Sequence, residues 1–530
     1  MKKPYILTTL LAAQLLCSCS DFLSEYSQDM VVPKSVTDIE EVLIGETYMK
    51  STETSYGMDN GTCGFFNMLD DDINTVGVAS TEKLGSYDAY TYVVNSMFGY
   101  YAWQQDVRYN YEHDSYNSDD GTWNDLYHRI NVANILLAEL EDVPHKTDED
   151  AADYTRVKGE IMFLRAQFYF VLANLYGKPY NPETCSTDLC VPLKLTHYVE
   201  YDKDKDTQFE RATVADIYSQ VVSDLLQAET LLTESPQKTS STLHRASWQA
   251  VDLLLSRVYL YMQDWASAEQ KAKTVIDDTQ FPLLGIANFT EGTPVLTASN
   301  REIIFSQGGN RLTPNRSSSL AASVYGNPSE YCVTRQLYAL YDEKDVRRAS
   351  YFGINSLSDS VYINKYEREV KLNSVSDALA MRKSEAYLNY SEACAMQNGK
   401  EQQANEALNT LRRQRIEGWQ DTTYTGQQLA EQIMLERRKE LCFEGQRWFD
   451  LRRYAVRNRY PALTDILHVF NEYTDNGVFV RAHYYLLKST DKSWTFAIPR
   501  AVLEADKTPM TDNERDQREE LDNDEKQQSL

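Results

Sequence analysis

Residues 436–453 read ERRKELCFEGQRWFDLRR, which is the densest charged pattern in the chain. On a helix, Glu440 and Glu444 would share one face, and Arg437 would lie one turn before Glu440. Gly445 is expected to break or tighten that helix before a second, aromatic turn. Each acid has arginine or lysine neighbours that would keep its pKa low, whereas a general acid needs a raised pKa. We therefore expect structural ion pairs here and no catalytic residue.

Helical periodicity extends outward from this stretch. The expected helices include the apolar stripes from Trp123 to Leu137 and from Ile161 to Leu175, residues 211–232, and the pairs 245–263 with 265–277 and 378–396 with 401–417. Tyr259, Trp265, Ala268 and Ala272 have the spacing and sizes of a tetratricopeptide repeat, in which small residues let two helices approach. The sequence predicts a mainly α fold with tetratricopeptide-like helix pairs as its scaffold, long irregular loops and a few short strands.

Residues 51–121 lack this periodicity and are rich in glycine, aspartate, asparagine and aromatic residues. Long irregular segments of compact proteins are usually functional. Aromatic rings stack on the apolar face of a sugar, while asparagine, aspartate and arginine bond its hydroxyls. The candidate ligand-binding residues are Trp103, Tyr101, Tyr100, Tyr87, Arg108, Asn110 and Tyr111. Trp103 is the strongest candidate because it lies off any helical stripe; alternatively, these aromatic residues pin the loop to the scaffold.

The first nineteen residues have the pattern of an export signal. Two lysines precede an apolar core from Tyr5 to Leu16, which is shorter than the ~20 residues needed to cross a bilayer. Leu16 stands three positions before Cys19, with small residues between them, and this arrangement resembles the lipobox of bacterial lipoproteins. The resemblance implies cleavage before Cys19 and acylation of that cysteine with fatty acids such as palmitate, leaving the protein anchored by lipid alone. In the alternative, the protein is secreted and Cys19 is incidental.

The chain is strongly acidic, with a formal net charge of −26. Removal of residues 1–18 takes away two lysines and no acid, which gives 51 − 79 = −28. Such a charge argues against binding to nucleic acid or to anionic lipid headgroups. Cys185 and Cys190 flank a short loop, where either a disulfide formed after export or two free surface thiols would fit.

A run of acids invites a metal interpretation. Asp70, Asp72 and Asn74 resemble the first ligands of an EF-hand calcium loop. Thr75, however, stands where the turn glycine belongs, and Thr81 stands where the final glutamate belongs. We expect neither a metal site nor a cofactor.

The stretch at 436–453 resembles the signature of the SusD/RagB family of nutrient-binding outer-membrane lipoproteins. The matching positions are Glu436, Arg437, Glu440, Glu444, Gly445, Arg447, Asp450, Leu451 and Arg453. The chain departs at Leu441, where an aromatic residue is common. The segments 123–134, 163–177, 341–347 and 496–500 also resemble parts of that family, so the resemblance spans nearly the whole mature chain.

The resemblance implies a surface-exposed, non-catalytic protein that is lipid-anchored in the outer membrane. Such a protein covers a SusC-like TonB-dependent transporter barrel and passes to it a captured glycan or, in peptide-binding RagB-like members, a peptide. The expected organisation is a signal peptide at 1–18, a lipidated cysteine and tether at 19–35, an N-terminal SusD-like region at 36–280 with the loop insertion at 51–121, a C-terminal SusD/RagB region at 281–511, and a charged, solvated tail at 512–530.

Two other classes of function stay open. A surface glycoside hydrolase would need two carboxylates about 5–10 Å apart, which sequence cannot exclude, although no Gly-x-Ser-x-Gly or His-x-x-x-His motif is present. A structural adaptor would bind the transporter and no small ligand.

Overall fold

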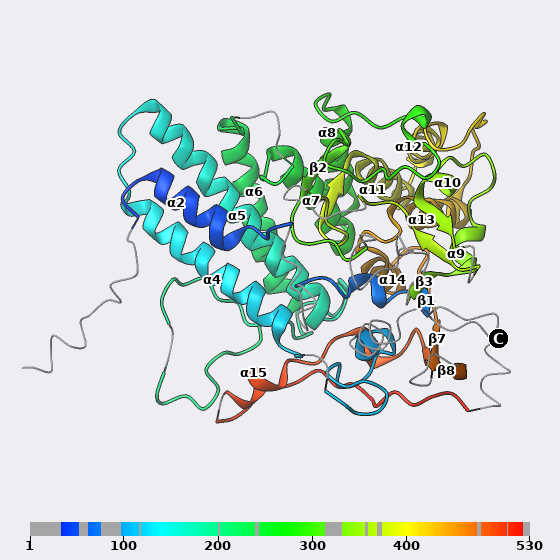
Figure 1. The fold of residues 1–530 in the computed structure, drawn as a ribbon. Coiled ribbons are helices and arrows are strands. Elements are labelled where there is room, and N and C mark those ends of the chain that lie inside the picture. Colours follow the sequence, from blue (N-terminus) through cyan, green and yellow to red (C-terminus); the bar gives the residue numbers. More distant parts are fainter. Residues whose placement is uncertain are drawn as a thin grey trace, which may run out of the picture.

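The computed structural model describes residues 33–51, 62–75, 97–115, 118–199, 202–238, 243–312, 331–355, 359–367, 374–473, 479–505 and 507–522. The expected export signal, Cys19 and Tyr87 lie outside these ranges. The longer helices are α4 (Gly121–Asp142), α5 (Asp148–Tyr176), α6 (Val214–Glu234), α7 (Trp248–Met262), α8 (Trp265–Asp277), α11 (Lys383–Ala395), α12 (Glu401–Arg413), α13 (Gly426–Leu441) and α14 (Arg447–Ala455). Helices dominate the molecule (Figure 1), which confirms the expected mainly α fold.

Short helical elements and strands fill the intervening segments. The helical ones are α2 (Val36–Val42), η1 (Leu43–Thr47), η2 (Phe66–Met68), η3 (Ile286–Asn288), α9 (Arg335–Ala339), α10 (Arg347–Tyr351), η4 (Lys492–Trp494) and α15 (Arg500–Glu504). The strands are β1 (Ile73–Thr75), β2 (Ile303–Ser306), β3 (Tyr331–Val333), β4 (Phe352–Ile354), β5 (Val361–Ile363), β6 (Ala380–Arg382), β7 (Ile466–Tyr473) and β8 (Phe479–Leu487). Among the described residues, no helix combines the length and the apolar character that a membrane span requires.

Local sequence explains where the long N-terminal helices begin and how closely they pack. Thr147 and Asp150 form a capping box at the start of α5, in which each side chain accepts a hydrogen bond from the other residue's backbone N–H. Where α5 crosses α6, a Cβ added to Gly159 would lie 2.8 Å from Cγ of Leu232. The glycine therefore permits a close approach of these two helices, which pack side by side in Figure 1.

The expected helix pairs are present in the second half of the scaffold. Helix α8 packs on α7 and α11, and α11 packs in turn on α12. Ala268 and Ala272 of α8 are fully buried, as the tetratricopeptide-like spacing predicts. Arg257 of α7 donates two hydrogen bonds of 2.7 Å to Glu385 of α11, so a buried ion pair also joins these helices.

Within the part of the chain that the structure describes, the strands form three small antiparallel sheets. One has the order β1-β3-β5-β4, another pairs β2 with β6, and the third is the hairpin of β7 and β8. The expectation of a few short strands agrees with these sheets, whereas the longer β7–β8 hairpin was not predicted. Thr75 Oγ1 donates to the carbonyl of Val469 at 2.6 Å and accepts from the N–H of Asn471 at 3.1 Å, which fixes β1 against β7.

The charged stretch at 436–453 forms a helix, a tight turn and a second helix. Helix α13 ends at Leu441, so the expectation that Glu440 and Glu444 share a helical face is wrong. The turn requires glycine at position 445, because φ there is +69° and a Cβ would lie 2.7 Å from Cα of Ala378. The turn still brings both acids to one guanidinium, with Arg382 2.6 Å from Glu440 and 2.8 Å from Glu444.

The buried charges of this turn belong to a network that we call the core network. Its members are Arg257, Glu302, Asp345, Arg347, Lys365, Arg382, Glu385, Glu392, Arg412, Arg415, Glu436, Arg437, Lys439, Glu440, Glu444, Asp450, Arg453 and Arg457. Glu440 alone lies 2.6–2.8 Å from three arginines. The predicted structural ion pairing is therefore confirmed.

Two smaller expectations meet different outcomes. Residues 512–522 were expected to be solvated and are mostly exposed or partly exposed, but Arg515 is buried and its guanidinium lies 4.9 Å from the centre of the Phe496 ring. The backbone N–H of Leu521 also donates to the carbonyl of Tyr484, so this solvated segment is attached to the folded body at these two points. Cys185 and Cys190 are free thiols, as in the second alternative, but both are buried rather than on the surface.

Candidate functional site

The acids of the core network are held in their charged form. Burial favours a raised pKa for Glu440, but Arg415, Arg382 and Arg347 outweigh it and hold that pKa well below its usual range. At Glu436 the same competition between burial and two arginines brings the pKa to about 2. A carboxyl with so low a pKa carries no proton to donate at neutral pH, so these residues suit a scaffold rather than a general acid.

Trp103 and Tyr101 lie in the interior. The indole N–H of Trp103 donates to the carbonyl of Leu69 at 2.9 Å, and only 1% of the residue is exposed. Both rings stack on the imidazole of His468 in β7, at centroid distances of 4.3 Å for Trp103 and 4.2 Å for Tyr101. These contacts favour the interpretation in which the aromatic side chains pin the loop to the scaffold.

Asn110 and Tyr111 also make internal contacts. Asn110 Oδ1 accepts hydrogen bonds from the N–H groups of Glu112 and Asp114, which shapes the turn that follows it. Tyr111 is only partly buried, and its ring packs against Phe98 and Phe470. Their predicted contact with ligand, like that of Tyr87, stays a prediction.

Tyr100 and Arg108 line a shared hollow that we call the loop pocket. Its volume is about 300 Å³, at the lower end of the range typical of ligand pockets, ~300–1,000 Å³. Tyr100 stacks on Phe65 with a centroid distance of 4.2 Å and an angle of 15°. Arg108 is partly exposed and pairs with Asp106 at 2.5 Å. The aromatic rings suit the apolar C–H face of a sugar ring, and the charged groups beside them suit its hydroxyls.

Other walls of the loop pocket come from distant parts of the chain. Phe496 and Arg515 lie roughly four hundred positions after Tyr100, and Tyr176 ends α5. Burial lowers the pKa of Arg515 to about 10, and no carboxylate of the described residues lies within ion-pairing distance of it. Sequence reasoning did not assign these residues to a site, because nothing local marks a contact over such a separation.

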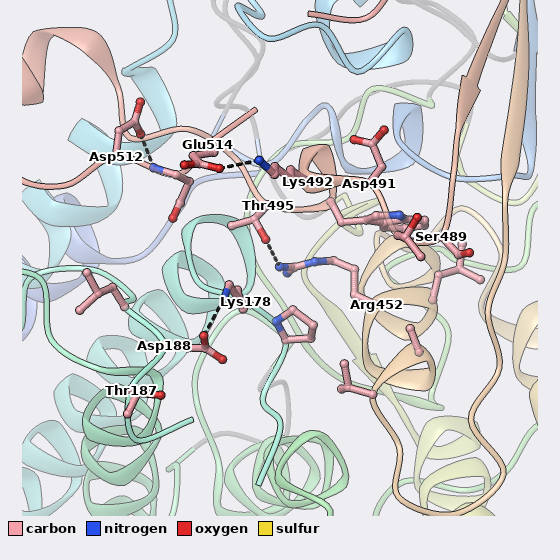
Figure 2. A pocket seen from close by; sticks show the side chains of 18 of the residues that line it. Lys178, Thr187, Asp188, Arg452, Ser489, Asp491, Lys492, Thr495, Asp512 and Glu514 are labelled. Carbon is pink, nitrogen blue, oxygen red and sulfur yellow. Dashed lines mark hydrogen bonds and ion pairs between the residues drawn. The ribbon is translucent and has the colours of Figure 1, made fainter. Parts of the chain in front are cut away.

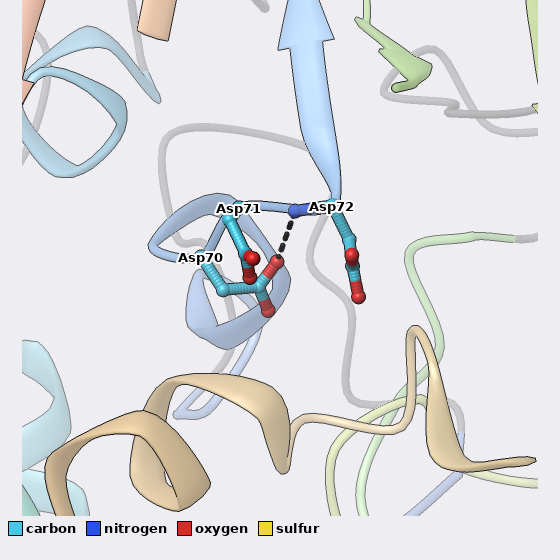
Figure 3. A group of neighbouring side chains, drawn as sticks. All are labelled: Asp70, Asp71 and Asp72. Carbon is cyan, nitrogen blue, oxygen red and sulfur yellow. Dashed lines mark hydrogen bonds between the residues drawn. The ribbon is translucent and has the colours of Figure 1, made fainter. Parts of the chain in front are cut away.

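The acidic run at 70–72 anchors the charged turn. The three carboxylates lie within 4.8 Å of one another, and Asp70 accepts a hydrogen bond from the N–H of Asp72 (Figure 3). Arg447 donates two hydrogen bonds, of 2.7 and 2.8 Å, to the Asp71 carboxylate, and Arg438 lies 2.6 Å from the carboxylate of Asp72. These guanidiniums supply the positive charge that a cation would bring, so the cluster ties α13 and α14 to the segment before β1.

Two models of protein families match this chain, and both describe SusD-like proteins. A family model described as the SusD family matches residues 194–526, which is more than half of the chain. A second model, described as starch-binding and associating with the outer membrane, matches residues 58–260. No curated protein matches the sequence significantly.

Solved structures share the fold. A SusD superfamily protein from Bacteroides thetaiotaomicron is 21% identical with a TM-score of 0.64, and the match covers 91% of this chain and 100% of that one. A putative sugar binding protein from Bacteroides vulgatus is 22% identical with a TM-score of 0.63, over 91% and 99% of the two chains. A SusD-like carbohydrate binding protein from the same species is 21% identical with a TM-score of 0.63, over 90% and 99%. From the extended match to the family model, together with this shared fold, it follows that the chain belongs to the SusD family.

Proposed function

We propose that this protein is a carbohydrate-binding lipoprotein of the outer membrane, which captures an oligosaccharide and delivers it to a SusC-like TonB-dependent transporter. The single observation that carries the proposal is the match to the SusD family over residues 194–526. Two solved structures with the same fold are described as sugar or carbohydrate binding proteins. The role is one of binding rather than catalysis, in keeping with the low pKa of the buried acids.

Within this proposal, the ligand contacts the loop pocket. Tyr100 and Arg108 line it, with Phe496 as a further aromatic wall. Arg108 has the exposure to reach a ligand, since 23% of its side chain is open to solvent. Trp103, Tyr101, Asn110 and Tyr111 then act mainly by holding the shape of the loop that carries these groups.

The binding test compares two arginine variants by calorimetry with a panel of neutral oligosaccharides, starch fragments included. Arg108→Ala should weaken binding by about tenfold, which corresponds to ~1.4 kcal/mol. Arg413→Ala is the matched control, because Arg413 is a partly exposed arginine on α12 that pairs with Asp421 outside the pocket. Equal affinity in both variants, with both folded, would remove the loop pocket from the proposal.

The same titrations separate the competing functions. Binding of peptides alone would favour a RagB-like peptide carrier, and the appearance of new reducing ends would favour a glycoside hydrolase. Cys19→Ala should leave a folded, ligand-binding protein that no longer sediments with the outer membrane. Retention of that variant in the membrane fraction would argue against the lipid anchor.

A further inference from the structure

A second, larger hollow lies between the end of α5 and helix α14. We call it the α14 pocket, and its volume is about 620 Å³. Figure 2 shows Arg452 of α14 at its centre, with Lys178 and Asp188 on one side and Lys492 and Glu514 on another. Asp512 borders both this pocket and the loop pocket, so the two hollows are neighbours. Neither the family match nor the sequence assigns any role to this second pocket.

The floor of the α14 pocket carries two arginines without acidic partners. Arg452 is 3% exposed and donates to the carbonyls of Asn174 and Gly177 and to the hydroxyl of Thr495. Arg211 donates to carbonyl oxygens that include those of Tyr176 and Cys190. No carboxylate of the described residues lies within ion-pairing distance of either guanidinium. The carbonyl contacts place both guanidiniums at the C-terminal end of α5. The helix dipole there supplies only about half a negative charge, which is less than the two positive charges of the arginines.

Arg452 also keeps unused donors. A guanidinium has five N–H groups, and the hydrogen bonds of Arg452 use three of them. Its Nε–H is buried and has no acceptor among the described residues. A buried, unpaired donor on a charged side chain is costly to leave unmet, so an incoming anionic acceptor would gain from it.

The rim of the α14 pocket does not neutralise this floor. Lys178 pairs with Asp188 at 2.7 Å, and Lys492 pairs with Glu514 at 2.5 Å, so these four charges cancel. Asp491 is engaged by Arg518 at 2.6 Å. Asp512, which accepts hydrogen bonds from backbone N–H groups, is the remaining acid of the lining. Once Arg518 is counted against Asp491, one net positive charge is left around the pocket, in a chain whose net charge is −26.

The walls of the α14 pocket have the chemistry of a sugar site. Hydroxyl and amide groups line it at Thr464, Ser489, Thr490, Thr495, Thr511 and Asn513. The indole of Trp494 stacks on Trp448 at a centroid distance of 4.4 Å and an angle of 22°, while the residue stays partly exposed and lines the pocket. An indole held on one face by a second indole is a rigid platform for the C–H face of a pyranose ring.

We propose that the α14 pocket binds a hexuronate unit of an acidic oligosaccharide, with the carboxylate directed to Arg452 and the ring against Trp494. The proposal rests on the carbohydrate-binding function argued above and extends it to a second subsite and to acidic sugars. A neutral sugar would use the hydroxyl groups and the indole but would leave the charge of the floor unmatched.

The test compares trigalacturonate with trigalactose on the whole mature chain by calorimetry. The acidic trimer should bind about tenfold more tightly, and its affinity should fall with added salt, because the added interaction is electrostatic. Lys178→Glu should weaken the acidic trimer by about fivefold and leave the neutral trimer unchanged. Lys273→Glu is the matched control, since Lys273 is an exposed lysine on α8 that pairs with Asp277.

Arg452→Gln probes the floor directly and should abolish the preference for the acidic trimer. Lys178→Glu keeps the test decisive if that floor variant fails to fold, because Lys178 is exposed. Equal binding of the two trimers, or full affinity for the acidic trimer in Lys178→Glu, would overturn the proposal while leaving the loop pocket intact. Failure of every saccharide to bind would instead reject both the subsite and the proposed carbohydrate-binding function.

Discussion

Arg452 and Arg453 are neighbours on α14, yet they belong to two different regions of the molecule. Arg453 lies in the core network, where it contacts both Glu392 and Asp450 at 2.5–2.8 Å. Burial lowers its pKa, but these acids outweigh that effect and raise the pKa well above its usual range. Arg452 faces the α14 pocket, where burial acts without a carboxylate partner and lowers the pKa to about 10.

The difference separates scaffold from site. A buried charge that is fully paired resists change, because removing either partner strands the other. A buried arginine without a carboxylate partner can instead bind the carboxylate of a ligand. The two arginines carry these opposite roles because successive residues of a helix point about 100° apart.

Lowering the pH should weaken the core network, and this is the largest effect on the free energy of unfolding that we expect. Arginine contacts outweigh burial at Glu392 and Glu436 and bring the pKa of each to about 2, from an ordinary value of 4.5. A lowered pKa contributes stability above pH 4.5 that is lost as the pH falls through 2. At ~1.36 kcal/mol per pKa unit, each glutamate accounts for about 3 kcal/mol.

Urea denaturation at pH values from 4.5 to 2 measures this loss, which should be about 6 kcal/mol for the two residues together. Asp377, whose pKa burial raises to about 6 from an ordinary value of 3.8, acts in the opposite direction, and its effect is complete by about pH 3.8, so the loss at lower pH belongs to the lowered acids. Glu392→Gln should reduce the total loss by about 3 kcal/mol, the share of that one residue. A free energy of unfolding that stays constant over this range would show that the network is not held by charge.

The next effect separates the two arginines directly. Arg453→Met leaves Glu392 and Asp450 short of a partner and should lower the free energy of unfolding by about 3–5 kcal/mol. Arg452→Met strands no carboxylate and removes hydrogen bonds at the end of α5, for about 1–2 kcal/mol. Chemical denaturation at pH 7 gives both values. Equal losses in the two variants would mean that pairing does not distinguish the two regions.

Much of the scaffold could be predicted because its signals are local. The stripes at 161–175 and 245–263 repeat at helical spacing, and α5 and α7 follow them. The helix break at Gly445 was also readable, because glycine is the residue suited to a positive φ. The β7–β8 hairpin was missed because a polar residue, His468, takes an inward position of β7, while Leu467 and Val469 take outward ones. Burial alternates along the strand, but hydrophobicity in the sequence does not.

The candidate site was harder to predict, because its contacts are not local. Tyr100 and Arg108 were recognised from composition, but Phe496 and Arg515 reach the loop pocket from the far end of the chain. Arg452 sits inside the charged signature, and its sequence neighbours suggest the same pairing as Arg453. Only the three-dimensional position of α5 shows that Arg452 meets carbonyl groups and an open pocket instead.

The smallest effect concerns Trp103, an uncharged residue for which the same question arises: whether it holds the scaffold or contacts ligand. This residue adopts φ 48°, a left-handed conformation that costs about 1–2 kcal/mol for a non-glycine residue. Its burial, its stacking on His468 and its bond to Leu69 offset that cost. Trp103→Phe keeps an aromatic ring but loses the bond, so the free energy of unfolding should fall by about 1–2 kcal/mol. Calorimetry should find oligosaccharide affinity nearly unchanged in this variant, because the indole holds the loop from the interior. A loss of affinity without a loss of stability would show instead that Trp103 contacts the ligand.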